Sequence, residues 1–265
     1  MFSDISKPKA LILRTAGTNC DYETRYAFEK AGAQVDVIHI NSLLENKNVL
    51  KEYQILTLPG GFTYGDDISA GKILANQIKH NLHDDIKTFI QEKKLILGIC
   101  NGFQTLTKAG LLPSINDVTQ TVTLTFNDSS KFEDRWVYLK ISSNKSPFIK
   151  DTDIAKLYLP VAHGEGKFIT KDAGVLNKIT RNKQIIFTYV NDRGEEAGYP
   201  WNPNGSVHNI AALCDETGQI LGMMPHPERH IESIRHPHWT RSGLKELGDG
   251  FFVFKNAVEY VKKNF

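Results

Sequence analysis

The sequence predicts an α/β fold with a mostly parallel central sheet flanked by helices and with additional antiparallel strands in the C-terminal half. In the first hundred residues, short apolar segments typical of strands alternate with segments of helical periodicity, which indicates β-α-β units. After about Pro113, strand-like segments follow one another with turn signals between them. No internal repeat or linker separates the halves, so we expect one domain over residues 1–265.

The composition is that of an ordinary globular protein. The 265 residues are 40% hydrophobic and 23% charged, and the net charge of +2 is too close to neutral to indicate a nucleic-acid-binding surface. No apolar run approaches the length of a membrane span, and Met1–Lys9 is too polar for a signal peptide. Cys20, Cys100 and Cys214 are sparse and odd in number, which argues against a disulfide framework and predicts a cytoplasmic protein.

Strands and helices are expected to alternate in the N-terminal half. Asp21 is a typical helix N-cap, and Ala31-Gly32-Ala33 ends the helix that it begins. The expected strands are Ala10–Leu13, Val35–Ile40, Tyr53–Leu58 and the run that ends at Ile99. The expected helices are Asp21 to about Lys30, a weaker one over Asn41–Lys51, then Ile73–Ile78 and Ile86–Gln91. In such folds, sites form beyond the carboxyl ends of the strands.

The C-terminal half is expected to consist mainly of strands. Turn signals at Asn191–Gly194 and Asn202–Gly205 suggest that some neighbours are antiparallel, and Phe251–Val261 is amphipathic and predicts a final helix. The expected strands are Val118–Phe126, Arg135–Ile141, Leu157–Ala162, Ile185–Val190, Val207–Cys214 and Gln219–Met224.

Cys100 marks a strand-to-helix corner. The apolar run up to Ile99 has the length of a buried strand, and Phe103 and Leu106 follow at helical spacing. Gly98-Ile99-Cys100-Asn101-Gly102 is therefore the nucleophile-elbow pattern with cysteine in place of serine. At such a corner the sulfur projects from the carboxyl end of the sheet, and the N-terminal end of the next helix favours the thiolate. The alternative is a small cysteine buried in the core.

His226 and Glu228 are the candidate base and its orienting group. They follow a predicted strand in Met224-Pro225-His226-Pro227-Glu228, where two prolines stiffen the chain. In an extended chain, residues two apart point to the same side, so both side chains could face the Cys100 corner. By the logic of the Ser-His-Asp triad, Glu228 would hold the imidazole while His226 moves the proton. The alternative is a structural histidine in an apolar segment.

Backbone N–H groups are the candidate oxyanion donors. One belongs to Asn101, directly after the nucleophile, and the other to Gly61 or its neighbour in Pro59-Gly60-Gly61-Phe62. The glycine pair could equally form only a tight loop. No Gly-Lys-Ser/Thr follows it, and no GxGxxG follows the first strand, so the chain lacks the usual signs of a nucleotide site of its own.

Five stretches resemble the class I glutamine amidotransferases, and most closely the glutaminase subunits of phosphoribosylformylglycinamidine synthase. They occur in the family's order and span most of the chain, from Lys9 to about Arg229. The resemblance implies a single-domain, flavodoxin-like amidotransferase fold. The stretches are Gly17–Asp21, Pro59–Asp66, Gly98–Gln104, Val161–Gly166, and Asn202–Ser206 together with Met224–Glu228.

The resemblance implies a reaction and its partners. Cys100 would attack the side-chain amide of L-glutamine, release ammonia and form a glutamyl thioester that water hydrolyses. The ammonia would pass to a synthetase subunit, assembled with a small third subunit, that makes formylglycinamidine ribonucleotide in purine biosynthesis. No cofactor or metal is implied for this chain; ATP and Mg belong to the synthetase. The implied glutamine-binding residues are Gly60, Phe62, Gln104, His163, Gly164 and Glu165.

Alternatives to this function remain at the level of sequence. They are a glutaminase for another pathway, a cysteine hydrolase on a related elbow fold, and a subunit that only docks on a synthetase. The resemblance weakens after Glu228, where residues 229–250 are expected to form an insertion or a partner-contacting segment. Its His230, His236 and His238 could suggest a metal, but no acidic or cysteine partner lies near them in sequence, so contact with the partner is the preferred interpretation.

Overall fold

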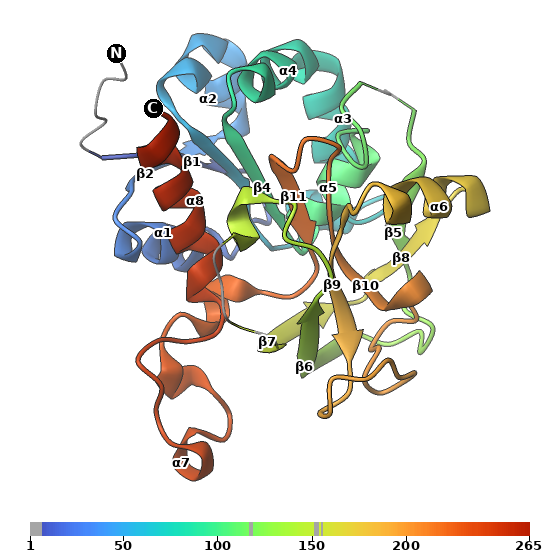
Figure 1. Cartoon of the computed structure of the whole chain (residues 1–265). Helices are drawn as coiled ribbons and strands as arrows, with labels where there is room; N and C mark the ends of the chain where they lie inside the picture. The colour runs from blue at the N-terminus through green and yellow to red at the C-terminus, as the bar shows by residue number, and fades with distance from the viewer. Residues whose placement is uncertain (1–6, 117–118, 151–153, 155) are drawn as a thin grey trace.

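A nine-stranded sheet forms the centre of the molecule (Figure 1). The computed structural model describes residues 7–116, 119–150, 154 and 156–265. Five strands pair in parallel on one side of the sheet, in the spatial order 2-1-3-4-5 of flavodoxin-like folds. They are β2 (Gln34–His39), β1 (Lys9–Arg14), β3 (Ile55–Leu58), β4 (Leu95–Ile99) and β11 (Ile220–Met223).

The same sheet continues with antiparallel strands from the C-terminal half of the chain. β11 pairs antiparallel with the next strand, and each of the following neighbours does the same. These strands are, in order, β10 (Ile210–Cys214), β9 (Ile185–Val190), β6 (Glu133–Ile141) and β7 (Lys156–His163). A separate antiparallel pair joins β5 (Val122–Thr125) to β8 (Lys167–Thr170). The expected α/β fold with additional antiparallel strands is confirmed.

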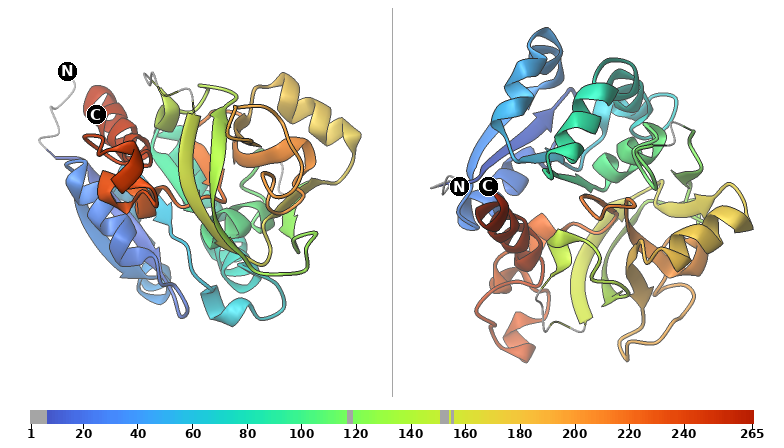
Figure 2. Two further views of the ribbon diagram at one scale, coloured as in Figure 1. Left: turned by 90° about the horizontal axis from the view of Figure 1, so that it is seen from below. Right: turned by 45° about the horizontal axis from the view of Figure 1, so that its top comes forward.

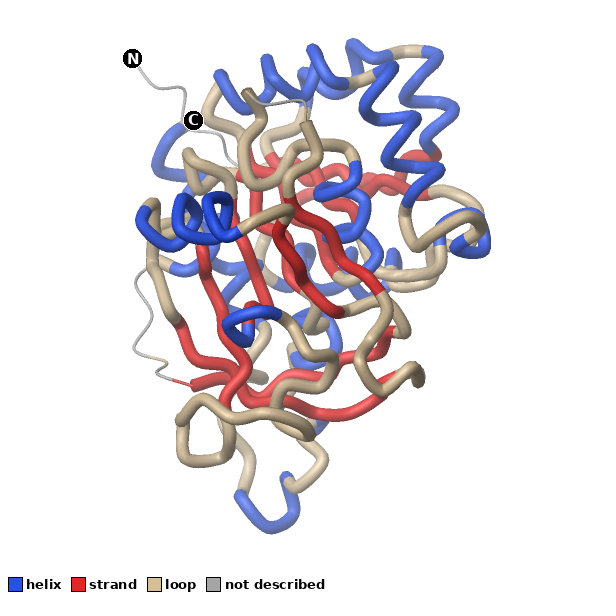
Figure 3. Tube along the Cα trace, turned by 90° about the vertical axis from the view of Figure 1, so that its right-hand side faces the viewer, coloured by secondary structure: helices blue, strands red, loops and turns tan. Residues whose placement is uncertain are grey.

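Helices cover both sides of the strands (Figure 3). On one side α1 packs on α8, with Phe28 and Phe254 edge to face at 4.9 Å between ring centroids, and on the other α3 contacts both α4 and α5 (Figure 2). The α-helices are α1 (Asp21–Lys30), α2 (Ile40–Glu45), α3 (Lys72–Asn81), α4 (His83–Gln91), α5 (Asn101–Lys108), α6 (Ala173–Arg181), α7 (Trp239–Ser242) and α8 (Phe251–Asn264). Short 3₁₀ helices are η1 (Lys47–Glu52), η2 (Thr63–Asp66), η3 (Pro147–Ile149), η4 (Val207–Asn209), η5 (Pro227–His230) and η6 (Ser233–Arg235).

Most expected elements are present, but several differ from the prediction. Asp21 is the first residue of α1, and Cys20 is the N-cap in its place. The helix expected over Asn41–Lys51 is divided into α2 and η1. The strand expected from Val207 begins at Ile210, because η4 first turns the chain through His208 at a φ of 48°. β8 and α6 are not among the elements expected from sequence, although Asp172 caps α6 by accepting a hydrogen bond from the Val175 N–H at 2.9 Å. The strand expected over Val118–Phe126 is confirmed for β5, while Val118 lies outside the described residues.

The segment 229–250 forms a loop closed at its base. The Gly248 N–H donates to the Ile231 carbonyl at 2.8 Å and the Gly250 N–H to the His230 carbonyl at 2.9 Å, while α7 projects from the body of the molecule (Figure 1). His230 and His236 pack around Trp136 of β6. The three histidines of this segment do not form a metal-binding group within the described chain.

Among the described residues, no helix has both the length and the apolarity to cross a bilayer.

Candidate active site

Cys100 stands at a sharp corner between β4 and α5. Its backbone has a φ of 50° and a ψ of −105°, a conformation that a residue with a side chain adopts only under strain. The turn is held because the Cys100 N–H donates to the Met223 carbonyl of β11 at 2.8 Å. A Cβ on Gly102 would lie 1.9 Å from the Leu58 carbonyl oxygen, so only glycine lets α5 start this close to β3. The expected strand–turn–helix corner is therefore present.

His226 and Glu228 meet at the end of β11. The His226 Nδ1 lies 2.6 Å from the Glu228 Oε1, and both residues are buried. The His226 N–H donates to the Pro160 carbonyl at 2.9 Å, which ties this turn to β7. The pair was expected on an extended chain, but Glu228 lies in η5, because Pro227 has the fixed φ of a helical first turn. The side chains still face each other.

Neighbouring groups control the charge of His226. Burial by itself would lower the pKa of His226, but the Glu228 carboxylate and the Cys100 sulfur outweigh burial and raise this pKa well above its ordinary value. Within the described residues, His226 Nε2 is buried and has no hydrogen-bond partner. Cys100 Sγ instead contacts the Ala162 carbonyl at 3.6 Å. Nε2 is thus the free atom of the ring for proton exchange with a reacting group.

A cavity of about 150 Å³ opens beside Cys100 and collects most of the residues expected from sequence. Gly61, Phe62, Cys100, Gln104, His163, Gly164 and Glu165 all line it. Gly60, Asn101, His226 and Glu228 are not among its lining residues. The cavity also has lining residues that were not expected from sequence, namely Asp66, Ala70, Phe126, Phe132 and Ala162. Asp66 ends one of the family-like stretches and Ala162 lies inside another, so a signal existed for these two only.

Gln104 and Glu165 form part of a polar network at the floor of this cavity. The Gln104 side chain donates to the Glu165 carbonyl at 2.6 Å and accepts from the Asn101 Nδ2 at 2.9 Å. Glu165 accepts a hydrogen bond from the Ala70 N–H at 3.1 Å and lies 3.4 Å from the ammonium of Lys108, which is buried in α5. These contacts fix the shape and charge of the cavity before any ligand enters.

His163 is held as a neutral side chain at the end of β7. Its Nδ1 lies 3.1 Å from the Asn127 Oδ1, and its Nε2 lies 3.4 Å from the Asn204 Nδ2. Burial, and then repulsion from His226, lower the pKa of His163 to about 3. A Cβ on Gly166 would lie 2.2 Å from the ring, so the loop also packs on it. His163 therefore supports the cavity wall and is not equipped to exchange protons near neutral pH.

The Gly60–Gly61 pair is clamped against the loop that precedes α1. The Cys20 N–H donates to the Gly60 carbonyl at 3.2 Å, and the Phe62 N–H to the Gly17 carbonyl at 2.9 Å. A Cβ on Gly60 would lie 2.7 Å from His226 Cε1 and 3.0 Å from Cys20 Sγ. Gly60 therefore packs against the histidine. The same contact brings Cys20 to the site, although nothing in the sequence spacing indicated it.

The fold and these groups point to a class of protein: a cysteine at a strand–helix elbow, with a buried His–Glu pair at the end of the neighbouring strand, is the arrangement found in cysteine-dependent acyl-transfer enzymes. A family model described as a CobB/CobQ-like glutamine amidotransferase domain matches residues 7–261. Phosphoribosylformylglycinamidine synthase subunit PurQ of Dehalococcoides mccartyi is 46% identical over 259 residues, which are 98% of this chain and 100% of that protein. The same subunit of Archaeoglobus fulgidus is 40% identical, over 98% of this chain and 99% of that one.

Solved structures agree with these relatives. The structure of PurLQS from Thermotoga maritima matches with a TM-score of 0.73 and 30% identity, over 96% of this chain and 99% of that chain. A glutamine amidotransferase from the same organism, at 15% identity and a TM-score of 0.51, shares the fold alone. The chain belongs to the CobB/CobQ-like glutamine amidotransferase family and, within it, to the PurQ subunits of phosphoribosylformylglycinamidine synthase. The resemblance carried by the five stretches is confirmed.

Proposed function

We propose that this chain is the glutaminase subunit of phosphoribosylformylglycinamidine synthase and acts as a single amidotransferase domain. The observation that carries the proposal is the meeting of a strained Cys100, a buried His226–Glu228 pair and a small cavity in one place. Strands from both halves of the chain build the sheet that positions them. Relatives that carry the PurQ name over their whole length support the choice of pathway.

The reaction begins with attack of the Cys100 thiolate on the side-chain amide carbon of glutamine. The raised pKa of His226 lets the imidazole hold a proton beside the nucleophile and give it to the departing nitrogen. Ammonia leaves and a glutamyl thioester remains on Cys100. His226 then takes a proton from water, which attacks the thioester and releases glutamate. Glu228 keeps Nδ1 bound throughout, so that Nε2 does the proton transfer.

The tetrahedral intermediate needs donors for its oxyanion. Asn101 is the first residue of α5, and its backbone N–H therefore has no partner within the helix. Gly61 lines the cavity next to Cys100 and can supply the second N–H. Each such donor contributes on the order of 10²- to 10³-fold in rate. The carboxyl groups of Asp66 and Glu165 also line the cavity and suit the ammonium group of glutamine.

Three phenylalanines surround the mouth of the cavity and form a surface for the synthetase partner. Phe62, Phe126 and Phe132 are 45%, 72% and 52% exposed, and Phe62 stacks on Phe132 at 6.3 Å between centroids. Aromatic side chains exposed together are typical of a protein–protein contact.

The partner would use the released ammonia with its own ATP and Mg, so this chain needs no cofactor. The segment 229–250 remains a second candidate contact, and the three free cysteines suit a cytoplasmic complex.

The test replaces the nucleophile in the assembled complex. Cys100→Ala should abolish glutamine-dependent synthesis, whereas synthesis from added ammonia should survive, because the synthetase chemistry lies in the partner. Loss of both activities would contradict the assigned role.

A second experiment labels the nucleophile. A glutamine-like diazo-ketone should add once to the wild-type chain, at Cys100, and excess glutamine should prevent this labelling. Labelling of Cys214 instead would return the chain to a hydrolase of unknown substrate.

A further inference from the structure

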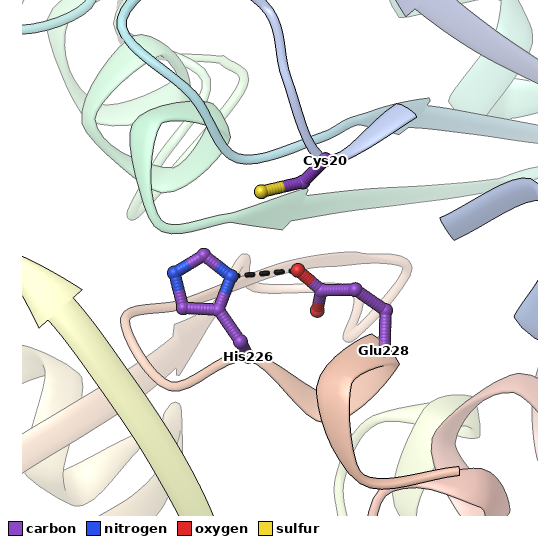
Figure 4. Close-up of side chains that lie close together, drawn as sticks. All are labelled: Cys20, His226 and Glu228. Carbon is purple, nitrogen blue, oxygen red and sulfur yellow. Dashed lines mark hydrogen bonds and ion pairs between the residues drawn. The ribbon is translucent and has the colours of Figure 1, made fainter. Parts of the chain in front are cut away.

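A second thiol lies against the histidine–glutamate pair. Figure 4 shows Cys20 reaching from the start of α1 toward the His226 and Glu228 side chains. One ligand atom from each of the three residues lies within 4.8 Å of the other two, and all three residues are buried. Cys20 has no part in the glutaminase chemistry proposed above. It occupies the N-cap position of α1, but its side chain makes no capping hydrogen bond, so capping does not account for a thiol at this position.

An unpartnered buried atom at the same place points to a ligand. Within the described residues, Glu228 Oε2 has no hydrogen-bond partner, although Glu228 is only 3% exposed. Buried polar atoms normally have a hydrogen-bond partner. A carboxylate oxygen without one, beside a thiol and an imidazole, therefore indicates a site where these three groups can coordinate a metal ion. Thiolate, imidazole and carboxylate are the ligands that zinc prefers in proteins.

We propose that Cys20, His226 and Glu228 form an inhibitory site for a thiophilic divalent cation of the zinc type. The inhibitory part of this inference rests on the proposed glutaminase function; the binding part does not. The site lies behind the cavity that receives glutamine, because none of its three residues lines that cavity. An ion bound there stops catalysis without competing with substrate.

The chemistry of inhibition follows from which nitrogen the ion occupies. The ion replaces the proton now shared by His226 Nδ1 and Glu228 Oε1, which are 2.6 Å apart and move apart to admit it. The Cys20 thiol releases its proton to solvent and coordinates as thiolate. The Nδ1 proton either moves to Nε2 or leaves, if Nε2 already holds one. With Nδ1 metal-bound and Nε2 protonated, His226 has no free electron pair to accept a proton from water.

The charges around the site are compatible with a bound dication. The thiolate and the carboxylate supply two negative charges to balance it. Arg229 opposes the ion, since its Nη2 donates to Cys20 Sγ at 3.2 Å, but its Nε is engaged 3.0 Å from Glu23 Oε1. Cys20 Sγ also lies 3.2 Å from Asn19 Oδ1, which accepts the thiol hydrogen that metal binding would remove.

The test uses Co²⁺ as an optical probe on the intact chain. Wild type should develop a thiolate-to-cobalt charge-transfer band that saturates at one equivalent, and Zn²⁺ should abolish the band by displacement. Cys20→Ser should weaken Co²⁺ binding at least about tenfold, because a hydroxyl is a poor ligand; serine is also a good N-cap, so α1 is kept. Cys100→Ala and Cys214→Ser should keep the band, since neither residue belongs to the site.

Turnover of glutamine completes the test. Zn²⁺ should lower kcat of the wild-type complex and leave KM unchanged, and Cys20→Ser should require at least about ten times more Zn²⁺ for half inhibition of its own basal rate. A band that survives in Cys20→Ser but disappears in Cys100→Ala would place the ion on the nucleophile and overturn the proposal, as would the absence of a band in wild type. A normal band in a chain without glutaminase activity would instead contradict the proposed function alone.

Discussion

The two buried histidines of the site show how neighbours decide the role of a side chain. His226 at the end of β11 and His163 at the end of β7 are each 2% exposed. Burial acts on both in the same direction and disfavours the charged ring. His226 faces the Glu228 carboxylate, which raises its pKa well above the ordinary value, whereas His163 faces the amides of Asn127 and Asn204 and has its pKa lowered to about 3.

This difference separates proton transfer from support. A histidine beside a carboxylate can carry a proton through a reaction cycle, while a histidine between amides stays neutral and serves as a rigid wall. Both types of neighbour hold the ring through a hydrogen bond to Nδ1, at 2.6 Å in His226 and 3.1 Å in His163. The charge of one partner atom, more than the depth of burial, therefore distinguishes the candidate base from a structural residue in this site.

The largest effect is expected from exchanging the neighbour of His226. Glu228→Gln keeps the shape of the side chain and removes its charge, so the pKa of His226 should fall and the imidazole should lose its correct orientation. We expect glutamine-dependent turnover to drop by about 10³-fold or more, measured as ammonia release in the complex. Glu232→Gln is the matched control, because Glu232 is a partly exposed acid four residues on that pairs with Lys30, and its loss should change turnover little. A near-normal rate for Glu228→Gln would mean that Glu228 does not orient the base.

A smaller effect is expected on stability in acid. Between about pH 3 and pH 6.5 the unfolded chain binds a proton at His163 and the folded chain does not. The free energy of unfolding should therefore decrease as the pH falls below 6.5, by about 2 kcal/mol at pH 5 from this residue, and be unaffected by it above pH 7. In His163→Gln this part of the decrease should vanish. Urea unfolding of both proteins at pH 7.5 and pH 5 measures it; parallel pH profiles would show that His163 is protonated in the folded state.

A change confined to the pKa of one residue is expected from giving His163 a carboxylate neighbour. Asn204→Asp places an oxygen where the amide nitrogen now lies 3.4 Å from His163 Nε2 and 3.3 Å from the Tyr189 hydroxyl, two groups that can both donate to it. The pKa of His163 should rise by about 1 to 3, as followed by NMR of the imidazole protons. Asn191→Asp in an exposed turn is the control. If the pKa remained near 3, burial alone would govern His163 and the comparison between the two histidines would fail.

The corner at Cys100 was predictable because its signal is local. An apolar strand, a glycine on each side of Cys100 and a helical repeat all lie within about ten residues, and the structure shows the corner that they describe. The His226–Glu228 contact was also predictable from a spacing of two residues, although the backbone that makes it is a 3₁₀ turn and not an extended strand. Short-range steric constraints and the fixed geometry of proline depend only on neighbouring residues, so they can be predicted from a short stretch of sequence.

The C-terminal half of the chain was less well predicted. β8 has only four residues and α6 begins with Ala-Gly, so both lack the strong periodicity that marks a longer element. The remaining cavity residues were missed for another reason. Phe126 and Phe132 look like ordinary surface or strand residues until β5, β7 and η2 bring their loops to one opening.

The sequence by itself determined the α/β class, the cysteine corner, the histidine–glutamate pair and the family, because each depends on patterns within short stretches or on their order along the chain. The tertiary structure alone decided that Cys20 lies against His226, that Gly60 packs on that ring, and that His163 is neutral. Such contacts join residues more than a hundred positions apart, or depend on how completely water is excluded. Neither property is encoded in local spacing, since both arise only when the sheet closes and its loops pack together.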